Sequence, residues 1–296
     1  MLDFQPLTLD CIPLVRADLS ESDLRTCDYS LGGVMLWRDY LQVNYARIGT
    51  TMIYRLILPD GTEAYQVPTV PDPGLLATVY RHCRERGEPC RFAFVPPQRK
   101  DAFSAVFASV EALPQREWYD YLYRKEDLIT YAGKKLRGQR NHVNKFRASY
   151  PQWDFVRGSE EDLPRLAEFY ARFRDENKKT APSWVEEERK IEEIFSHFNE
   201  YGFLCGILTV NGTVAGFSLG ERRGDTLFVH TEKADRRLHG VYPMLASRFV
   251  EAFSDDSVVY VNREDDSGDE GLRAAKLSYH PCALLEKLLI TVGDPF

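Results

Sequence analysis

The sequence predicts an α/β protein built from two successive modules, each a mixed sheet flanked by helices. Three observations support this. The length of 296 residues lies near the upper limit for a single hydrophobic core. A similar order of hairpin, strand and helix patterns occurs in each half, and a strongly basic helical segment lies between the halves. We therefore expect a first domain at residues 1–134 and a second at residues 135–296.

The first half begins its regular structure with a hairpin. Residues 53–58 and 63–67 alternate in polarity and flank Pro59-Asp60-Gly61, where Asp-Gly supplies the positive φ of a tight turn. Apolar residues then recur at helical spacing from residue 75 to Gly87. Residues 91–95 favour a strand, and residues 103–107 favour a second helix.

The second half repeats this plan without detectable sequence identity to the first. Residues 203–210 and 213–219 flank Asn211-Gly212, which is the strongest hairpin signal in the chain. The patterns that follow predict a strand at 226–231, a helix at 241–253, a buried strand at 258–261 and a helix at 270–279. Any duplication is therefore one of architecture.

The segment between the halves, residues 134–150, combines many cations with no acid. Its apolar residues fall on one helical face, which leaves the cations on the other; these apolar residues are Leu136, Val143, Phe146 and Tyr150. Two interpretations stay open: a solvated connecting helix, or a contact for RNA phosphates or lipid head groups. The candidate contact residues are Lys134, Lys135, Arg137 and Arg140.

Composition limits the classes of function. A net charge of −7 and a pI near 5.5 argue against a protein whose whole surface binds nucleic acid or anionic lipid. The chain shows no signal-peptide pattern and no apolar run of the ~18 residues that a membrane span needs. The six cysteines form no CxxC pair, which favours reduced thiols over disulfides or zinc. We therefore expect a cytoplasmic protein, with peripheral membrane contact left open.

Two polar segments of the second half predict a binding site. The first is the strand-to-helix turn at 230–242, where Arg236, Arg237 and Gly240 precede a helix. Free amides at a helix N-terminus and two guanidinium groups would bind a phosphate.

The second polar segment follows the strand at 258–261, with the residues Asn262-Arg263-Glu264-Asp265-Asp266 at the carboxyl end where open α/β sheets place ligands. Ser267 and Glu270 have the spacing of a capping box for the next helix, and Ala275 and Tyr279 would share one face of that helix.

These segments also resemble known families. The turn is similar to the pyrophosphate loop of GNAT acyltransferases at Arg237 and Gly240, although Tyr242 replaces the last small residue of that loop. The strings 262–266 and Lys276-Leu277-Ser278-Tyr279-His280-Pro281 closely resemble proteins related to the C-terminal domain of phosphatidylglycerol lysyltransferase. The resemblance implies tandem GNAT-like domains over nearly the whole chain, distantly related to Fem-type transferases that take amino acids from aminoacyl-tRNA.

The resemblance also implies that the activity resides in the second half. We expect Glu264 and Asp265 to accept a proton, Tyr279 to protonate the leaving group, and Lys276 to bind a phosphate or an oxyanion. The expected contacts with the donor or its phosphates are Arg236, Arg237, Gly240, Tyr242, Asn262 and Arg263. The equivalent turn of the first half, Val70-Pro71-Asp72-Pro73-Gly74, has no cation, so we expect that half to have a structural or acceptor-shaping role.

The leading hypothesis is the transfer of an aminoacyl group from charged tRNA, or of another acyl group, to an amine or hydroxyl of a small or lipid-linked acceptor. An acetyl-coenzyme A-dependent N-acetyltransferase and a non-catalytic binding protein are the alternatives. No metal is expected, because the sequence has no HExxH motif and no EF-hand spacing. The donor, the acceptor and the oligomeric state stay open.

Overall fold

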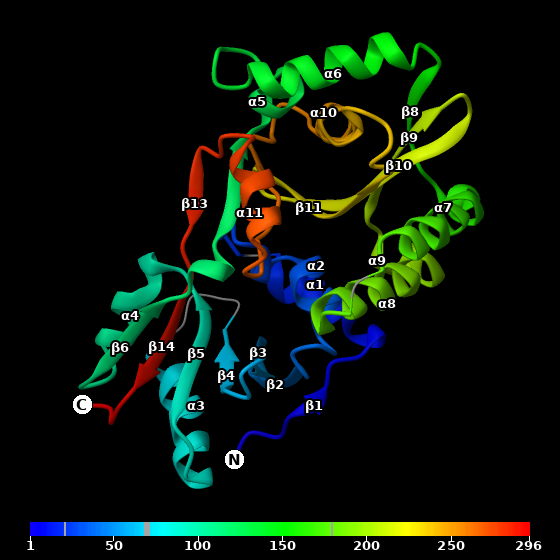
Figure 1. The fold of residues 1–296 in the computed structure, drawn as a ribbon. Helices are drawn as coiled ribbons and strands as arrows, with labels where there is room; N and C mark the ends of the chain where they lie inside the picture. The colour runs from blue at the N-terminus through cyan, green and yellow to red at the C-terminus, as the bar shows by residue number, and fades with distance from the viewer. Residues whose placement is uncertain (21, 68–71, 179) are drawn as a thin grey trace. The chain divides into compact units, whose positions relative to one another are not determined.

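The computed structural model describes residues 1–20, 22–67, 72–178 and 180–296, which form two compact units (Figure 1). Unit 1 comprises residues 1–120, 265–268 and 285–296, and unit 2 comprises residues 121–264 and 269–284. The expected boundary at residue 134 differs from this division for two reasons. Strand β7 (Asp120–Arg124) pairs with β12 in the second sheet, and β14 (Leu288–Val292) lies between β5 and β6 in the first.

Unit 1 contains a seven-stranded mixed sheet in the order β1-β2-β3-β4-β5-β14-β6. The predicted hairpin is confirmed as the antiparallel pair β3 and β4, and β5 then pairs with β4 in parallel. Besides β14, the strands are β1 (Gln5–Pro6), β2 (Asn44–Ile48), β3 (Thr51–Ile57), β4 (Glu63–Gln66), β5 (Cys90–Val95) and β6 (Val110–Pro114).

The helices of unit 1 are α1 (Ile12–Leu19), α2 (Leu31–Leu36), α3 (Pro73–Arg86) and α4 (Lys100–Ser104), with short 3-10 turns at Leu9–Cys11, Cys27–Tyr29, Pro97–Arg99 and Arg116–Trp118. Helix α3 begins where the Asp72 carboxylate accepts a hydrogen bond from the Leu75 amide, and it ends at the left-handed Gly87. The carboxylate of the first-half turn is thus used as a helix cap. Val70 and Pro71 lie outside the described residues.

Unit 2 contains a second seven-stranded sheet, in the order β13-β7-β12-β11-β10-β9-β8. The hairpin predicted at Asn211-Gly212 is confirmed: both residues have positive φ, and Thr213 pairs with Val210. The remaining strands are β8 (Trp153–Arg157), β9 (Leu204–Val210), β10 (Thr213–Arg223), β11 (Thr226–Ala234), β12 (Tyr260–Asn262) and β13 (Ala283–Leu285).

Helices cover both faces of the second sheet (Figure 1). On β10, Phe217 contacts the rings of α7 and α8, whereas the backbone of Gly220 faces Phe249 of α10. The helices are α5 (Lys125–Thr130), α6 (Arg137–Ser149), α7 (Leu163–Glu176), α8 (Pro182–Ser196), α9 (Phe198–Tyr201), α10 (Val241–Phe253) and α11 (Glu270–Leu277), with a 3-10 turn at Glu160–Asp162. Within the described ranges, no helix is both long and apolar enough to cross a bilayer.

The start and end of α11 differ from the prediction. Its N-cap is Asp269, whose carboxylate accepts a hydrogen bond from the Leu272 amide at 2.8 Å, and Ser267 instead bonds to Asp265. The predicted capping box is therefore wrong. The helix ends at Leu277, so Tyr279 lies in the turn after it and does not share a helix face with Ala275. As expected, none of the cysteines forms a disulfide, and all but Cys282 are buried.

Candidate active site

The candidate active site lies where two parallel strands of unit 2 part. Strands β11 and β12 pair from Thr226 and Tyr260 to Phe228 and Asn262, where β12 ends and β11 continues to Ala234. The side chains beyond this point lie between the diverging strand ends. Glu232 comes from β11, and Arg263 directly follows β12.

A buried ion pair joins the two diverging strands. Arg263 donates from Nε to Glu232 Oε2 at 3.1 Å, and its Nη2 bonds to the same carboxylate. The two side chains are only 10% and 12% exposed. The guanidinium also lies 4.5 Å from the ring centre of Tyr279. Its Nη1 is buried and forms no hydrogen bond within the described part of the chain, although Tyr279 lies beside the guanidinium.

Tyr279 packs below this ion pair and is 6% exposed. Burial raises the pKa of Tyr279 to about 12, although the positive charge of Arg263 opposes the rise. The hydroxyl therefore keeps its proton at neutral pH, as a general acid requires. Lys276 donates to the Arg263 carbonyl at 2.6 Å, and its own carbonyl accepts from the Tyr123 hydroxyl at 2.8 Å. The predicted site residue Lys276 thus holds the backbone of Arg263.

Glu264 belongs to a buried network that the sequence analysis missed. Its Oε1 lies 2.7 Å from His230 Nδ1, and the other ring nitrogen, Nε2, lies 3.0 Å from Glu221 Oε1. The His230 side chain is 0% exposed. Burial alone would lower the pKa of His230, but the hydrogen bonds to Glu221 and Glu264 and the charges of both carboxylates raise it to about 9. The signals available in the sequence were His230 in the predicted strand at 226–231 and Glu221 just after the predicted hairpin.

The other residues of the acidic segment have separate partners. Asn262 is fully buried, and its Oδ1 accepts from the Glu264 amide at 2.6 Å. Asp265 and Asp266 belong to unit 1. Asp266 is buried and bonds to Arg116 at 3.2 Å and to the Gly268 amide at 3.0 Å. Asp265 accepts from Ser267, so these two acids have structural partners that Glu264 does not share.

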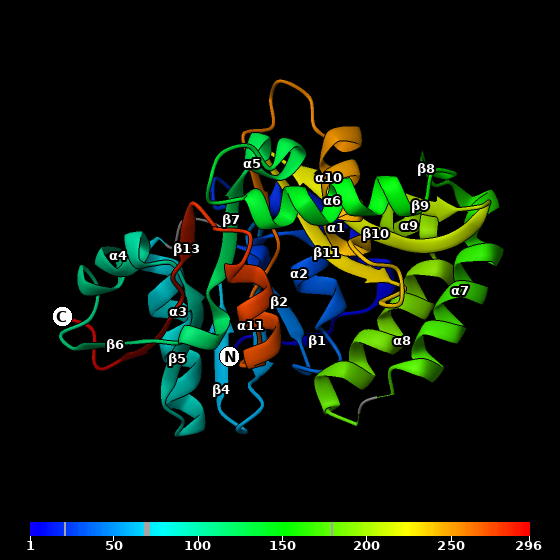
Figure 2. The same cartoon turned by 45° about the horizontal axis from the view of Figure 1, so that its top comes forward.

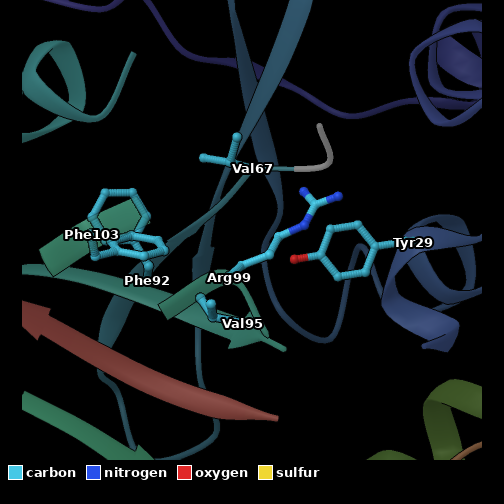
Figure 3. A pocket seen from close by; sticks show the side chains of 6 residues that line it. All are labelled: Tyr29, Val67, Phe92, Val95, Arg99 and Phe103. Atoms are coloured by element: carbon cyan, nitrogen blue, oxygen red, sulfur yellow. The ribbon is translucent and has the colours of Figure 1, made fainter. Parts of the chain in front are cut away.

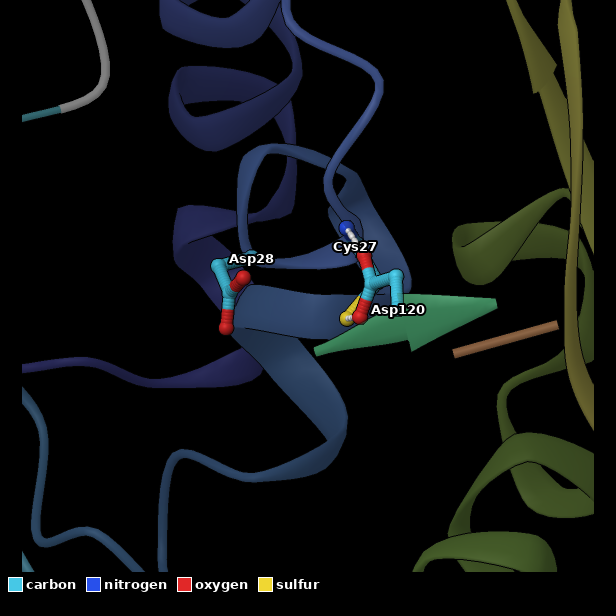
Figure 4. A group of neighbouring side chains, drawn as sticks. All are labelled: Cys27, Asp28 and Asp120. Carbon is cyan, nitrogen blue, oxygen red and sulfur yellow. Dashed lines mark hydrogen bonds between the residues drawn. The ribbon is translucent and has the colours of Figure 1, made fainter. Parts of the chain in front are cut away.

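Unit 1 contains a buried group of Cys27, Asp28 and Asp120 whose ligand-type atoms could approach a metal (Figure 4). The Cys27 thiol lies 3.2 Å from Asp120 Oδ1. However, the fully buried Lys287 ammonium lies 2.7 Å from Asp120 and 2.5 Å from Asp28. The chain's own cation therefore occupies the position that a metal ion would take. Burial raises the pKa of Asp28 to about 7 despite this lysine.

A small cavity in unit 1 is lined by Tyr29, Val67, Phe92, Val95, Arg99 and Phe103 (Figure 3). Its volume of about 10 Å³ corresponds to roughly one water molecule. This volume is far too small for an acyl donor or acceptor. The cavity is therefore a packing feature of the first core.

In the turn before α10, several groups of the predicted phosphate site bond within the chain. Arg237 is 71% exposed, and its guanidinium binds Asp235 at 2.8 Å and Glu176 at 3.2 Å. The amides of Arg237, His239 and Val241 donate to Asp235 Oδ1, the Tyr150 hydroxyl and the Leu238 carbonyl.

Two further residues of this turn explain why it is closed. Pro243 has no amide to offer. Tyr242, which stands in place of a small residue, is largely buried, and its hydroxyl accepts from the Ala234 amide at 3.4 Å. Three amides of the turn and the Arg237 guanidinium thus have partners within the chain, so fewer of its donors are available to a pyrophosphate. Arg236 is exposed.

Gly240 has a packing role in this turn. Its φ is +79°, and a Cβ added there would lie 2.2 Å from the carbonyl oxygen of His142 on α6. The His142 and His239 rings also meet, with Nδ1 and Nε2 3.0 Å apart. The start of α10 is therefore pressed against the backbone of α6.

Helix α6 is amphipathic, as predicted, with Leu136 at its N-cap and Val143 and Phe146 all buried. Two of the residues predicted to contact RNA phosphates or lipid head groups instead bond within the chain. Arg140 donates to the carbonyls of Tyr131 and Gly133, and Lys135 pairs with Asp127 at 3.0 Å. Four exposed cations of this segment form no ion pair within the described residues: Lys134, Arg137, Lys145 and Arg147, the last of which lies 5.8 Å from the ring centre of Trp153.

Comparison with known proteins assigns the family. The family model described as phosphatidylglycerol lysyltransferase, C-terminal, matches residues 20–290. The chain belongs to this family. A conserved protein of unknown function from Bacteroides thetaiotaomicron is 28% identical, with a TM-score of 0.89 and coverage of 99% of this chain and 100% of the other.

More distant structures confirm the predicted tandem GNAT-like fold. The L-PGS structure from Bacillus licheniformis is 12% identical, with a TM-score of 0.64 over 94% of this chain and 90% of that one. FemX is 9% identical, with a TM-score of 0.58 over 99% and 98%. An uncharacterized protein of Mycoplasmoides gallisepticum is 25% identical over 175 residues, which are 58% of this chain and 56% of that protein. The match thus spans about half the length of this curated relative.

The packing at Gly240 can be tested by comparison with a glycine in open space. Gly240→Ala should lower the free energy of unfolding by more than about 2 kcal/mol. The added methyl group would clash with the His142 carbonyl, and alanine also disfavours the positive φ of this position. Gly212→Ala is the matched control, with a φ of +75° and no atom within 4 Å, and should cost about 1 kcal/mol. Urea unfolding measures both. Equal losses would show that α6 does not press on the turn.

Proposed function

We propose that this chain is an aminoacyltransferase that uses the polar site between β11 and β12. The observation that carries the proposal is the position of Arg263, Glu232 and Tyr279 where the two parallel strands part, in a chain of the phosphatidylglycerol lysyltransferase C-terminal family. This is the carboxyl end of strands, where open α/β sheets bind ligands.

The three groups that the reaction needs are present in unit 2. An amine or hydroxyl of the acceptor attacks the ester carbonyl carbon of the donor, and Glu264 takes the proton that the nucleophile loses. The Nη1 donor of Arg263 stabilises the oxyanion. As the ester C–O bond breaks, Tyr279 gives its proton to the leaving oxygen. Glu264 later returns a proton to Tyr279 through solvent, so the cycle closes without a cofactor.

The closed turn before α10 favours charged tRNA over coenzyme A as the donor. The amides and the guanidinium that would hold a pyrophosphate have internal partners. The exposed cations Arg137 and Lys145 on α6 and Lys134 just before it instead offer a surface for RNA phosphates, in a protein with a net charge of −7. An aminoacyl-tRNA donor would place the reaction in the cytoplasm.

The acceptor is an amine or hydroxyl on a small or lipid-linked molecule. The family description names phosphatidylglycerol, whose glycerol hydroxyls are suitable nucleophiles. The α6 cations would also suit an anionic head group, so peripheral contact with a membrane surface belongs to this proposal.

The hypothesis of an acetyl-coenzyme A-dependent N-acetyltransferase loses the support of Arg237, because that side chain binds Asp235 and Glu176.

Donor choice can be measured by thermal shift. We expect lysyl-tRNA to raise the melting temperature, because a ligand at a hundredfold its dissociation constant stabilises the folded protein by about 2.7 kcal/mol. Coenzyme A and acetyl-coenzyme A should leave the melting temperature unchanged, and uncharged tRNA separates recognition of RNA from recognition of the ester. Stabilisation by coenzyme A alone would reverse the assignment of the donor.

The role of Tyr279 can be tested with Tyr279→Phe. Transfer of [14C]lysine from lysyl-tRNA to phosphatidylglycerol in detergent micelles should slow by about 100-fold or more, because the leaving oxygen loses its acid. Tyr131→Phe is the matched control. Tyr131 is fully buried in the same core, and its hydroxyl donates to the Pro243 carbonyl, so this variant should cost about 1 kcal/mol of stability and keep the rate. Full turnover by Tyr279→Phe removes this residue from the acid role.

Charge reversal tests the α6 surface. In the triple variant Lys134→Glu, Arg137→Glu and Lys145→Glu, tRNA binding should weaken, and the slope of log Kd against log salt should fall by roughly two to three, since about three phosphate contacts are lost. Arg81→Glu with Arg84→Glu is the control, because both residues are exposed cations on α3 of unit 1. Filter binding over a salt series gives both slopes. An unchanged slope in the triple variant returns α6 to the role of a connecting helix.

A further inference from the structure

The buried histidine of unit 2 has no role in the mechanism above. We propose that His230 is a positioning residue that keeps the Glu264 carboxylate ionised and fixed in one orientation. This inference rests on the proposed function for the role of Glu264 as proton acceptor. It adds a control on the protonation of that same site, which neither the family match nor any related structure assigns.

The hydrogen bonds of the imidazole require its charged form. Nδ1 faces Glu264 at 2.7 Å and Nε2 faces Glu221 at 3.0 Å. With both carboxylates ionised, each only accepts hydrogen bonds, so both ring nitrogens then donate. The same two carboxylates hold the pKa of His230 at about 9. The ring is therefore an imidazolium throughout the neutral pH range.

The charge count explains why two glutamates are present. The imidazolium of His230 and the carboxylate of Glu264 alone would form a neutral pair, in which the positive charge fully balances the negative charge of the proton acceptor. With Glu221 as the second carboxylate, the group carries a net charge of −1 when both acids are ionised. Glu221 thus stabilises the charged ring, and Glu264 remains able to take a proton from a nucleophile.

The backbone of Glu264 is fixed as firmly as its side chain. Its φ of +57° lies in the left-handed region, which non-glycine residues seldom adopt. The Glu264 amide donates to Asn262 Oδ1 at 2.6 Å, and its carbonyl accepts from the Tyr121 amide at 3.1 Å. A strained residue persists where its surroundings hold it from several directions, and such residues gather at functional sites.

Aromatic rings keep water from the histidine. Phe203 lies 5.1 Å from the ring of His230, and Phe228 stacks on it at 6.5 Å between centroids. Charged hydrogen bonds are stronger where water is excluded. The buried ring of His230 can therefore hold the Glu264 carboxylate in one position.

Two measurements test the proposal. In 15N spectra of the wild-type protein at pH 7, both ring nitrogens of His230 should be protonated. In His230→Gln, the apparent pKa of Glu264, followed by its 13Cδ signal and assigned with Glu264→Gln, should rise by at least about one unit, because the imidazolium charge is lost. His82→Gln, which replaces a buried histidine of unit 1, should leave the titration of Glu264 unchanged.

Turnover and stability add two further readouts. In the lysine transfer assay, His230→Gln should lower kcat by about tenfold or more with little change in KM, and the acid limb of its pH profile should move to higher pH.

The pKa of His230 is raised above the unfolded value of 6.5, so its contribution to stability is complete below pH 6.5 and is lost as the pH rises through 9. The difference in unfolding free energy between wild type and His230→Gln should shrink accordingly.

The outcomes separate this inference from the proposed function. A neutral His230 ring at pH 7, or an unchanged Glu264 pKa in folded His230→Gln, overturns the inference whatever the activity. If the wild type transfers no amino acid, the proposed function fails while the spectra still decide the state of the network. If His230→Gln does not fold, the wild-type 15N spectrum decides alone.

Discussion

The ion pair between Arg263 and Glu232 is the interaction on which the site depends. It joins two parallel strands at the level where their backbone hydrogen bonds have stopped, and it lies largely out of water. Removing two charges from water costs free energy. A buried ion pair offsets this cost when its hydrogen-bond geometry is good, and otherwise its retention indicates a functional role. Two hydrogen bonds to Glu232 Oε2 and the face of the Tyr279 ring hold the guanidinium in one orientation.

The surroundings of Tyr279 and Glu264 change the proton affinities of these two groups in opposite directions. Tyr279 and Glu264 both lie near the end of β12, yet burial makes the hydroxyl a weaker acid, while a buried imidazolium favours the charged form of the carboxylate. Groups whose environments push their proton affinities apart can act as an acid and base pair. In the turn before α10, by contrast, the amides of Arg237, His239 and Val241 donate hydrogen bonds within the chain.

Much of this was visible in the sequence. The Asn211-Gly212 hairpin, helix α10 and the polar segment after β12 depend on local turn chemistry and periodicity, and they were predicted correctly. The partners of these residues could not be predicted in the same way. The contact of Glu264 with His230 spans 34 residues, and that of Gly240 with α6 depends on how two helices pack. The division into two units differs from the expected boundary at residue 134 for a similar reason, because no local pattern reveals that β14 joins the first sheet.

The placement of β14 has a consequence for how the protein is made. The first sheet has a gap between β5 and β6 until residues 288–292 have been synthesised. The same tail carries Lys287, the ammonium that compensates the buried carboxylates of Asp28 and Asp120. A nascent chain emerging from the ribosome can therefore complete the second sheet before the first. Residues 1–120 lack part of their own sheet until residues 285–296 are present, so they are not a fragment that can be cut out and expected to fold alone.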